Sequence, residues 1–99
     1  MNLQPNLEAV KRQARDLNRE EPRSPEEKLG GFEIAARCLD KCRATLAGTQ
    51  GEFLYGCPMD QKFLAQAGLT AKDFQAFVAT GASDGEVAAW IEEHATARA

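Results

Sequence analysis

Apolar and polar side chains alternate at helical spacing along most of the chain, and glycine or proline separates one such segment from the next. The widest apolar arc lies between Gly31 and Gly48, where apolar or small side chains recur every three or four residues. A helix places these side chains on one face, which consists of Phe32, Ile34, Ala35, Cys38, Leu39, Cys42, Thr45 and Leu46. The pattern therefore predicts a central, partly buried helix over residues 31–47 that Gly48 ends.

Three shorter helices are predicted in the second half of the chain, after an irregular loop over residues 49–57. Pro58 suits the first turn of a helix that stops at Gly68. Thr70 and Ser83 each precede an acidic residue by three positions, which is the spacing of an N-terminal cap. The residues expected to face inward are Met59, Phe63, Leu64, Ala67, Phe74, Phe77, Val78, Val87, Trp90 and Ile91.

The N-terminal segment carries weaker helical patterns. Residues 6–19 predict a helix with one thin apolar stripe, made of Leu7, Val10, Ala14 and Leu17. Ser24, Pro25 and Glu27 match a capping box and predict a short helical turn that reaches Leu29. Because so thin a stripe stabilises little by itself, the helix should dock on its own domain or on a second copy of the chain, which would give a homodimer.

Together these elements predict the fold class. We expect an all-α protein, a compact single-domain bundle of about five helices with one irregular loop. Residues 1–21 are expected to form an N-terminal amphipathic helix or extension, and residues 22–99 the helical domain.

Length and charge narrow the class of protein. The 99 residues fit one small domain, and 12 basic against 15 acidic side chains leave a net charge of −3. Such a chain lacks the positive field that nucleic-acid binding needs, and no apolar run reaches the roughly 20 residues of a membrane span. The first residues lack the apolar segment of a signal peptide, so we expect a cytoplasmic protein with reduced thiols.

Two of the three cysteines match a packing role. Cys38 and Cys42 are four residues apart within the apolar arc, and with Cys57 and His94 they could in principle bind zinc. Core packing explains the same spacing, because residues four apart also share a buried helix face. We therefore expect core thiols at these two positions and neither a metal nor another cofactor.

Cys57 is the candidate catalytic residue. It stands where a helix is expected to begin, and the positive end of a helix dipole stabilises a thiolate. The carboxylates of Glu52 and Asp60 oppose that effect if they are close in space. A nucleophilic or redox role, assisted by Tyr55 or Lys41, is one hypothesis, and a packed or capping cysteine is the alternative.

The polar face of the central helix is the candidate ligand-binding site. Cations outnumber anions on this face of an otherwise acidic chain, so a carboxylate or phosphate could dock on it. An exposed face with weak ion pairs explains the same pattern. With a tyrosine from the following loop, the residues of the predicted cationic site are Arg37, Asp40, Lys41, Arg43 and Tyr55.

Several stretches of the chain resemble a known family. They extend from about Pro22 to about Ile91 and read PRSPEEKLGG, RCLDKCRATLAG, GEFLYGCPMDQKFL and ATGASDGEVAAWI. They resemble a small bacterial family of domains of unknown function, numbered five thousand and sixty-nine. The resemblance implies a compact, mainly helical, cytosolic protein but no activity. It also implies that the family's motif positions are occupied by Arg37, Asp40, Lys41, Arg43, Tyr55, Cys57, Asp60 and Trp90.

These observations leave two functional hypotheses. The leading one is a small binding or interaction module whose cationic site takes a carboxylate, a phosphate or an acidic segment of a partner protein. The alternative is a thiol-based enzyme or redox protein that uses Cys57. No catalytic triad order, glycine-rich phosphate loop or paired-carboxylate motif points to a familiar enzyme class.

Overall fold

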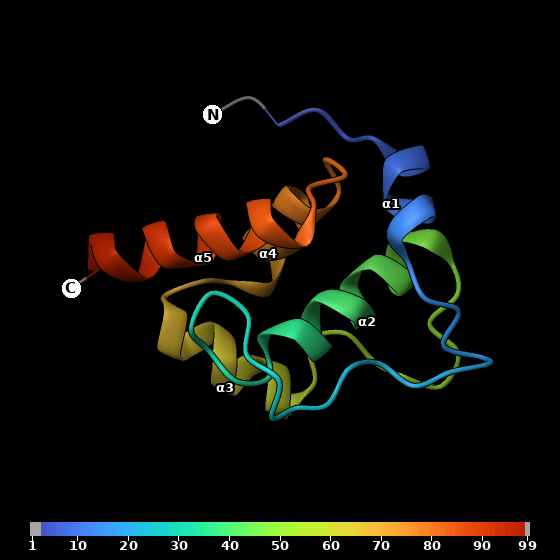
Figure 1. Cartoon of the computed structure of the whole chain (residues 1–99), viewed down its shortest axis with the longest axis horizontal. Coiled ribbons are helices and arrows are strands. Elements are labelled where there is room, and N and C mark those ends of the chain that lie inside the picture. Colours follow the sequence, from blue (N-terminus) through green and yellow to red (C-terminus); the bar gives the residue numbers. More distant parts are fainter. Residues whose placement is uncertain (1–2, 99) are drawn as a thin grey trace.

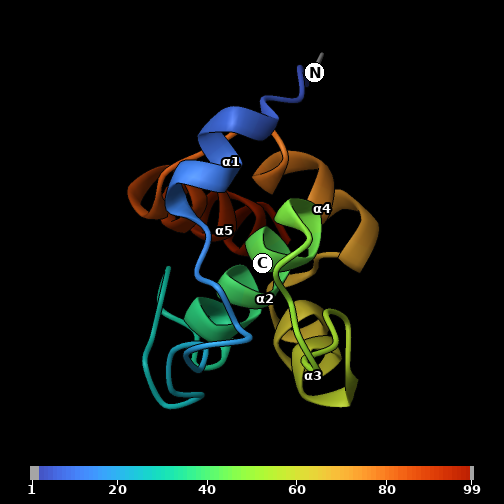
Figure 2. The ribbon, with the colours of Figure 1, turned by 90° about the vertical axis from the view of Figure 1, so that its right-hand side faces the viewer.

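The computed structural model describes residues 3–98, with side chains described through Ala95, and this part of the chain contains five helices and no strand. The helices are α1 (Leu7–Gln13), α2 (Ala35–Ala47), α3 (Pro58–Ala67), α4 (Ala71–Val78) and α5 (Asp84–Arg98). α2 contacts α1, α3 and α4, while α3 also contacts α5, as Figures 1 and 2 show. The predicted all-α fold is confirmed, and residues 49–57 form an irregular loop as predicted.

The hydrophobic core fills the space where the last four helices meet. Phe63 of α3 and Phe74 of α4 are fully buried, with ring centres 5.8 Å apart in an edge-to-face arrangement. Trp90 of α5 extends this cluster and stacks on Phe77 at 4.7 Å. Cys38 and Cys42 are fully buried in the same core, as their spacing predicts.

Local capping explains why the second half of the chain folds as predicted. The hydroxyl of Thr70 accepts a hydrogen bond from the N–H of Asp73 at 3.1 Å. Ser83 and Glu86 form the reciprocal capping box, with distances of 2.9 and 3.2 Å. One predicted core residue, Met59, is 44% exposed, so that prediction is wrong.

The first half of the chain departs from the helical predictions. α1 ends at Gln13, because Ala14 adopts an extended conformation and the following segment runs along α2 (Figure 1). Leu17 is buried as expected but outside any helix, with its N–H donating to the carbonyl of Thr49 at 2.8 Å. At Ser24, the side chain accepts from the N–H of Glu26 and forms a turn in place of the predicted helical turn.

The central helix begins four residues later than predicted. Gly31 and Ile34 have φ angles of 85° and 73°, which no α-helix accommodates. Leu29 and Phe32 pair with each other through two backbone hydrogen bonds of 3.0 and 3.2 Å. These contacts form a tight loop over residues 28–34, which leads directly into α2 at Ala35.

The polar face of α2 shows the largest difference between the predicted and the observed exposure. Asp40, Lys41 and Arg43 were expected on a polar surface, but they are only 4%, 3% and 4% exposed. Other segments cover them and supply opposite charges. A helical pattern identifies which side chains share a face, but whether that face meets solvent depends on the rest of the chain.

Candidate functional site

A buried lysine joins a carboxylate to a thiol where α2 meets the beginning of α3. The Nζ atom of Lys41 lies 2.9 Å from Oδ2 of Asp60 and donates to Sγ of Cys57 at 3.1 Å. Lys41 is 3% exposed and Asp60 is fully buried, whereas Cys57 is half-buried. We call Lys41, Asp60 and Cys57 the thiol cluster.

The turn before α3 positions two members of this cluster. Cys57 is the N-cap residue of α3, with an extended backbone, and Pro58 occupies the first helical position. The N–H of Gly56, a residue with a φ of 86°, donates to Oδ2 of Asp60 at 2.8 Å. The Cys57 side chain makes no capping hydrogen bond to α3, so its sulfur accepts from Lys41 instead.

Lys41 carries a positive charge in this cluster. Burial lowers the pKa of Lys41, but the hydrogen bonds to Asp60 and Cys57 and the charge of Asp60 outweigh burial and raise the pKa above its usual 10.5. At neutral pH Lys41 is therefore a hydrogen-bond donor and not a base. The Oδ1 atom of Asp60 is buried and has no hydrogen-bond partner in the described part of the chain.

The neighbouring titratable groups are held in neutral forms. Burial raises the pKa of Cys42 to about 12 and also raises that of Cys38. Burial likewise raises the pKa of Tyr55, whose hydroxyl donates to the carbonyl of Ala71 at 2.6 Å. Tyr55 is therefore not a base for Cys57, and Cys57 is the one cysteine that is not fully buried.

A second group of charges, in which Asp40 and Arg43 are buried, connects α2 to the segment before it and to α5. Arg23 contacts Asp40 at 3.0 Å and Asp84 at 2.8 Å, and Arg43 contacts Asp84 at 2.8 Å. Arg43 also donates to the side chain of Gln13 in α1 at 3.1 Å. We call Arg23, Asp40, Arg43 and Asp84 the arginine cluster. Together with Gln13 it connects α1, the segment before α2, α2 itself and α5, so its evident role is architectural.

The structure gives the three cations of the predicted cationic site different partners. Lys41 belongs to the thiol cluster, and Arg43 belongs to the arginine cluster together with Asp40. Arg37 donates to a backbone carbonyl of the preceding segment at 3.3 Å, and its guanidinium lies 5.6 Å from the ring centre of Phe53. Two of the three cations are thus neutralised inside the protein.

Three residues of the two clusters lie outside the sites that the sequence predicts. The sequence indicates Asp60 only as a charge near Cys57 and as a motif position, and its place in the first turn of α3 is the available signal. Arg23 and Asp84 lack a local signal, because the contacts of Arg23 with Asp40 and Asp84 span 17 and 61 residues of sequence.

The residues considered for zinc do not come together as a ligand set. Among the described residues, no group of three or more His, Cys, Asp or Glu side chains is arranged to hold a metal ion. The ring of His94 lies 4.3 Å from that of Trp90, and its Nδ1 is 2.9 Å from the carbonyl oxygen of Trp90. His94 is thus engaged with its own helix.

Similarity to known proteins assigns a family but no activity. No curated protein matches the chain. None of the described helices combines the length and apolar character needed to cross a bilayer. The family model described as a domain of unknown function (DUF5069) matches residues 19–99, which include every member of the thiol and arginine clusters. The chain therefore belongs to the DUF5069 family.

Proposed function

We propose that the protein acts through nucleophilic thiol chemistry at Cys57. The observation that carries this proposal is the hydrogen bond of 3.1 Å from Lys41 Nζ to Cys57 Sγ, made by a lysine that a buried carboxylate fixes in place. A neighbouring cation and a helix N-terminus both favour the thiolate, which is the reactive form of cysteine. Cys57 has both features, since Lys41 contacts its sulfur and Cys57 is the N-cap residue of α3.

Each member of the thiol cluster has a distinct role in this proposal. Cys57 is the nucleophile, whose sulfur forms a bond to an electrophilic carbon while the leaving group departs with the bonding electron pair. Lys41 is a positioning residue that offsets negative charge on the sulfur. Asp60 holds Lys41 and the turn before α3, although its own charge partly opposes the thiolate.

Accessibility also supports Cys57 over the other cysteines. Cys38 and Cys42 are fully buried in the core, whereas Cys57 is half-buried at the beginning of α3. A small electrophile in solution can therefore reach Cys57 without unfolding of the core. This difference predicts site-selective modification of the native protein.

The geometry supports the binding hypothesis less well. Lys41 and Arg43 are paired with internal carboxylates and are almost completely buried. An external carboxylate or phosphate would have to displace Asp60 or Asp84 from these cations. The displaced carboxylate would then lose its partners, which is most costly for the buried Asp60. The cationic site on α2, the homodimer and the cytoplasmic location stay predictions.

The proposal is tested by alkylation of the native protein with iodoacetamide, with the modified cysteine located by mass spectrometry. We expect Cys57 to react faster at neutral pH than a small free thiol, and Cys38 and Cys42 to stay unmodified. The double substitution Lys41→Met with Asp60→Asn removes both buried charges and keeps similar side-chain volumes. It should slow modification of Cys57 by at least about tenfold, because the lost cation contacts the sulfur directly and its loss outweighs that of the opposing Asp60 charge.

Two control variants make this experiment specific. Lys72→Gln removes a lysine that is exposed on α4 and should leave the alkylation rate unchanged. Cys57→Ser should abolish labelling without loss of helical circular dichroism. If Cys57 reacts no faster than a free thiol and the double variant matches the original protein, the proposal is wrong.

A further inference from the structure

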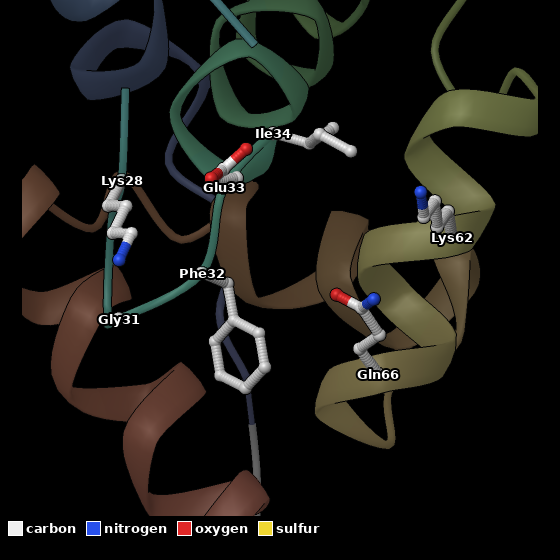
Figure 3. A pocket seen from close by; sticks show the side chains of 7 residues that line it. All are labelled: Lys28, Gly31, Phe32, Glu33, Ile34, Lys62 and Gln66. Atoms are coloured by element: carbon white, nitrogen blue, oxygen red, sulfur yellow. The ribbon is translucent and has the colours of Figure 1, made fainter. Parts of the chain in front are cut away.

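An open hollow of about 370 Å³ lies between the loop over residues 28–34 and one face of α3. The loop forms one wall, with the side chain of Lys28 and residues 31–34, as Figure 3 shows. α3 forms the other wall with Lys62 and Gln66, and Gln66 extends from the helix toward the ring of Phe32 (Figure 3). The volume falls within the range of small-molecule sites.

The charge of this hollow differs from that of the protein as a whole. Lys28 and Lys62 line opposite walls of the hollow, and neither forms an ion pair with any residue that the structure describes. Glu33 is the only acidic side chain of the lining, so the lining carries net positive charge on a chain whose net charge is −3. These cations are free to bind an anion, unlike Lys41 and Arg43.

The hollow also offers an apolar surface beside its charges. Phe32 and Ile34 line it and are each partly buried against the core. The ring of Phe32 packs edge-on against that of Phe63, with ring centres 5.9 Å apart, which fixes its position. A ligand with an apolar part next to its anionic group would contact both kinds of surface.

The loop wall is held in its conformation by the surrounding chain. The N–H of Ile34 donates to the carbonyl of Pro25 at 2.7 Å, and Ile34 keeps a φ of 73° that is unfavourable for a branched side chain. A Cβ atom added at Gly30 would lie 3.0 Å from the carbonyl oxygen of Ala88 and from Cβ of Ile91, so the loop lies tightly against α5. A wall fixed in this way loses little conformational freedom when a ligand binds.

We propose that this hollow binds a small organic phosphate monoester, with Lys28 and Lys62 as the cations and Phe32 as the apolar contact. Lysine ammonium groups are effective phosphate ligands, and the Gln66 amide adds a hydrogen-bond donor. The site is separate from the thiol cluster in its residues and does not rest on the chemistry proposed for Cys57.

The probe for this proposal is phenyl phosphate, titrated into the full ¹⁵N-labelled chain at constant ionic strength. We expect saturable shifts of amide resonances from residues 28–34 and 62–66. Inorganic phosphate should bind at least about tenfold more weakly, because it lacks the apolar group that contacts Phe32. Equal affinity for the two probes would remove Phe32 from the site.

Substitutions identify the cations that bind the probe. Lys28→Gln and Lys62→Gln should each weaken binding of phenyl phosphate by at least about tenfold. Lys72→Gln is the matched control, since this lysine is exposed on α4 outside the hollow, and it should have no effect. An equal loss in all three variants, or shifts spread over the whole surface, would show unspecific attraction and would overturn the proposal.

Discussion

The arginine cluster and the thiol cluster both bury charges of α2, but only the arginine cluster satisfies all of its carboxylate oxygens. Both oxygens of Asp40 accept hydrogen bonds from Arg23, at 3.0 to 3.2 Å. Both oxygens of Asp84 accept as well, one from Arg23 and one from Arg43, each at 2.8 Å. Planar guanidinium groups suit this double pairing.

The thiol cluster is less complete. A single oxygen of Asp60 takes both the Lys41 ammonium and the Gly56 N–H, while the other oxygen is buried without a partner among the described residues. The second group to which Lys41 donates is the sulfur of Cys57, and a neutral thiol is a weak hydrogen-bond acceptor.

This difference separates a fully paired network from an incompletely paired one. A buried network whose polar atoms are all paired stabilises one arrangement of the chain. An incompletely paired network costs stability, and such costs concentrate at sites of function. The comparison therefore supports the chemistry proposed for the thiol cluster, and the following experiments test the distinction from the largest expected effect to the smallest.

The largest expected effect is that of Asp60→Ala, which leaves the Lys41 ammonium buried without a carboxylate. The free energy of unfolding should fall by about 3–5 kcal/mol. Asp84→Ala should cost only about 1–2 kcal/mol, since Asp84 is half-exposed and Arg23 keeps Asp40. The buried Arg43 also keeps its hydrogen bonds to Gln13 and to the carbonyl of Ala82. Urea unfolding followed by circular dichroism measures both losses.

A double variant checks that the loss comes from the unpaired charge. Lys41→Met combined with Asp60→Asn should recover most of the stability that Asp60→Ala removes, because no charge stays buried. If Asp60→Ala and Asp84→Ala cost the same, the two clusters do not differ in the way proposed here.

Gly81→Ala should release α1 from the arginine cluster while leaving the thiol cluster intact. Gly81 has a φ of 87°, and an added Cβ would lie 2.5 Å from Cβ of Ala9. The carbonyl of Gly81 also accepts from Gln13, which in turn accepts from Arg43. We expect a loss of about 2–3 kcal/mol in unfolding free energy, with the alkylation rate of Cys57 unchanged.

Gly48→Ala is the matched control for this substitution. Gly48 has a similar φ of 79°, but no atom lies within 4 Å of its added Cβ. Its cost should be limited to the left-handed backbone conformation, about 1–2 kcal/mol. Equal losses at the two glycines would show that the contact with α1 contributes nothing.

Tyr55→Phe tests whether the hydrogen bond between Tyr55 and α4 is structural. The substitution removes the donor to the Ala71 carbonyl, a hydrogen bond of 2.6 Å. Stability should fall by about 1–2 kcal/mol, which thermal or urea unfolding detects. Because Tyr55 is a neutral phenol, Cys57 should be alkylated at an unchanged rate. A marked slowing in this variant would give Tyr55 a direct part in the chemistry.

The smallest expected effect is the acid dependence that Asp84 contributes. Burial raises the pKa of Asp84, but the hydrogen bonds and charges of Arg23 and Arg43 outweigh it, so the pKa lies below the usual 3.8. The stability that Asp84 provides is therefore fully present above about pH 4 and is lost as the pH falls below that value. Asp84→Asn should flatten this part of the stability profile, measured by urea midpoints between neutral and acid pH.

The helices of the second half of the chain could be predicted because their signals are local. Thr70 contacts an N–H three residues away, and Ser83 and Glu86 cap each other. The beginning of α2 could not be placed in the same way. Phe32 and Ile34 continue the apolar pattern of the helix, but contacts with Leu29 and Pro25 hold them in a loop.

The candidate site was only partly predictable for a related reason. Cys57 could be selected, since its position before Pro58 is a local property of the sequence. The sequence leaves Tyr55 and Lys41 as alternative partners of Cys57, because only the packing of α3 near α2 decides which side chain meets the sulfur. The pattern assigned Lys41 correctly to a polar arc, and the structure then covers that arc.

The sequence by itself determined the helical class, the caps of α4 and α5, and the burial of Cys38 and Cys42, because these depend on residues a few positions apart. The tertiary structure decided which charges are buried and which cations stay free to bind a ligand. A charged side chain leaves water only where an opposite charge meets it. For Arg43 that charge is Asp84, 41 residues further along the chain, and only the folded chain brings the two together.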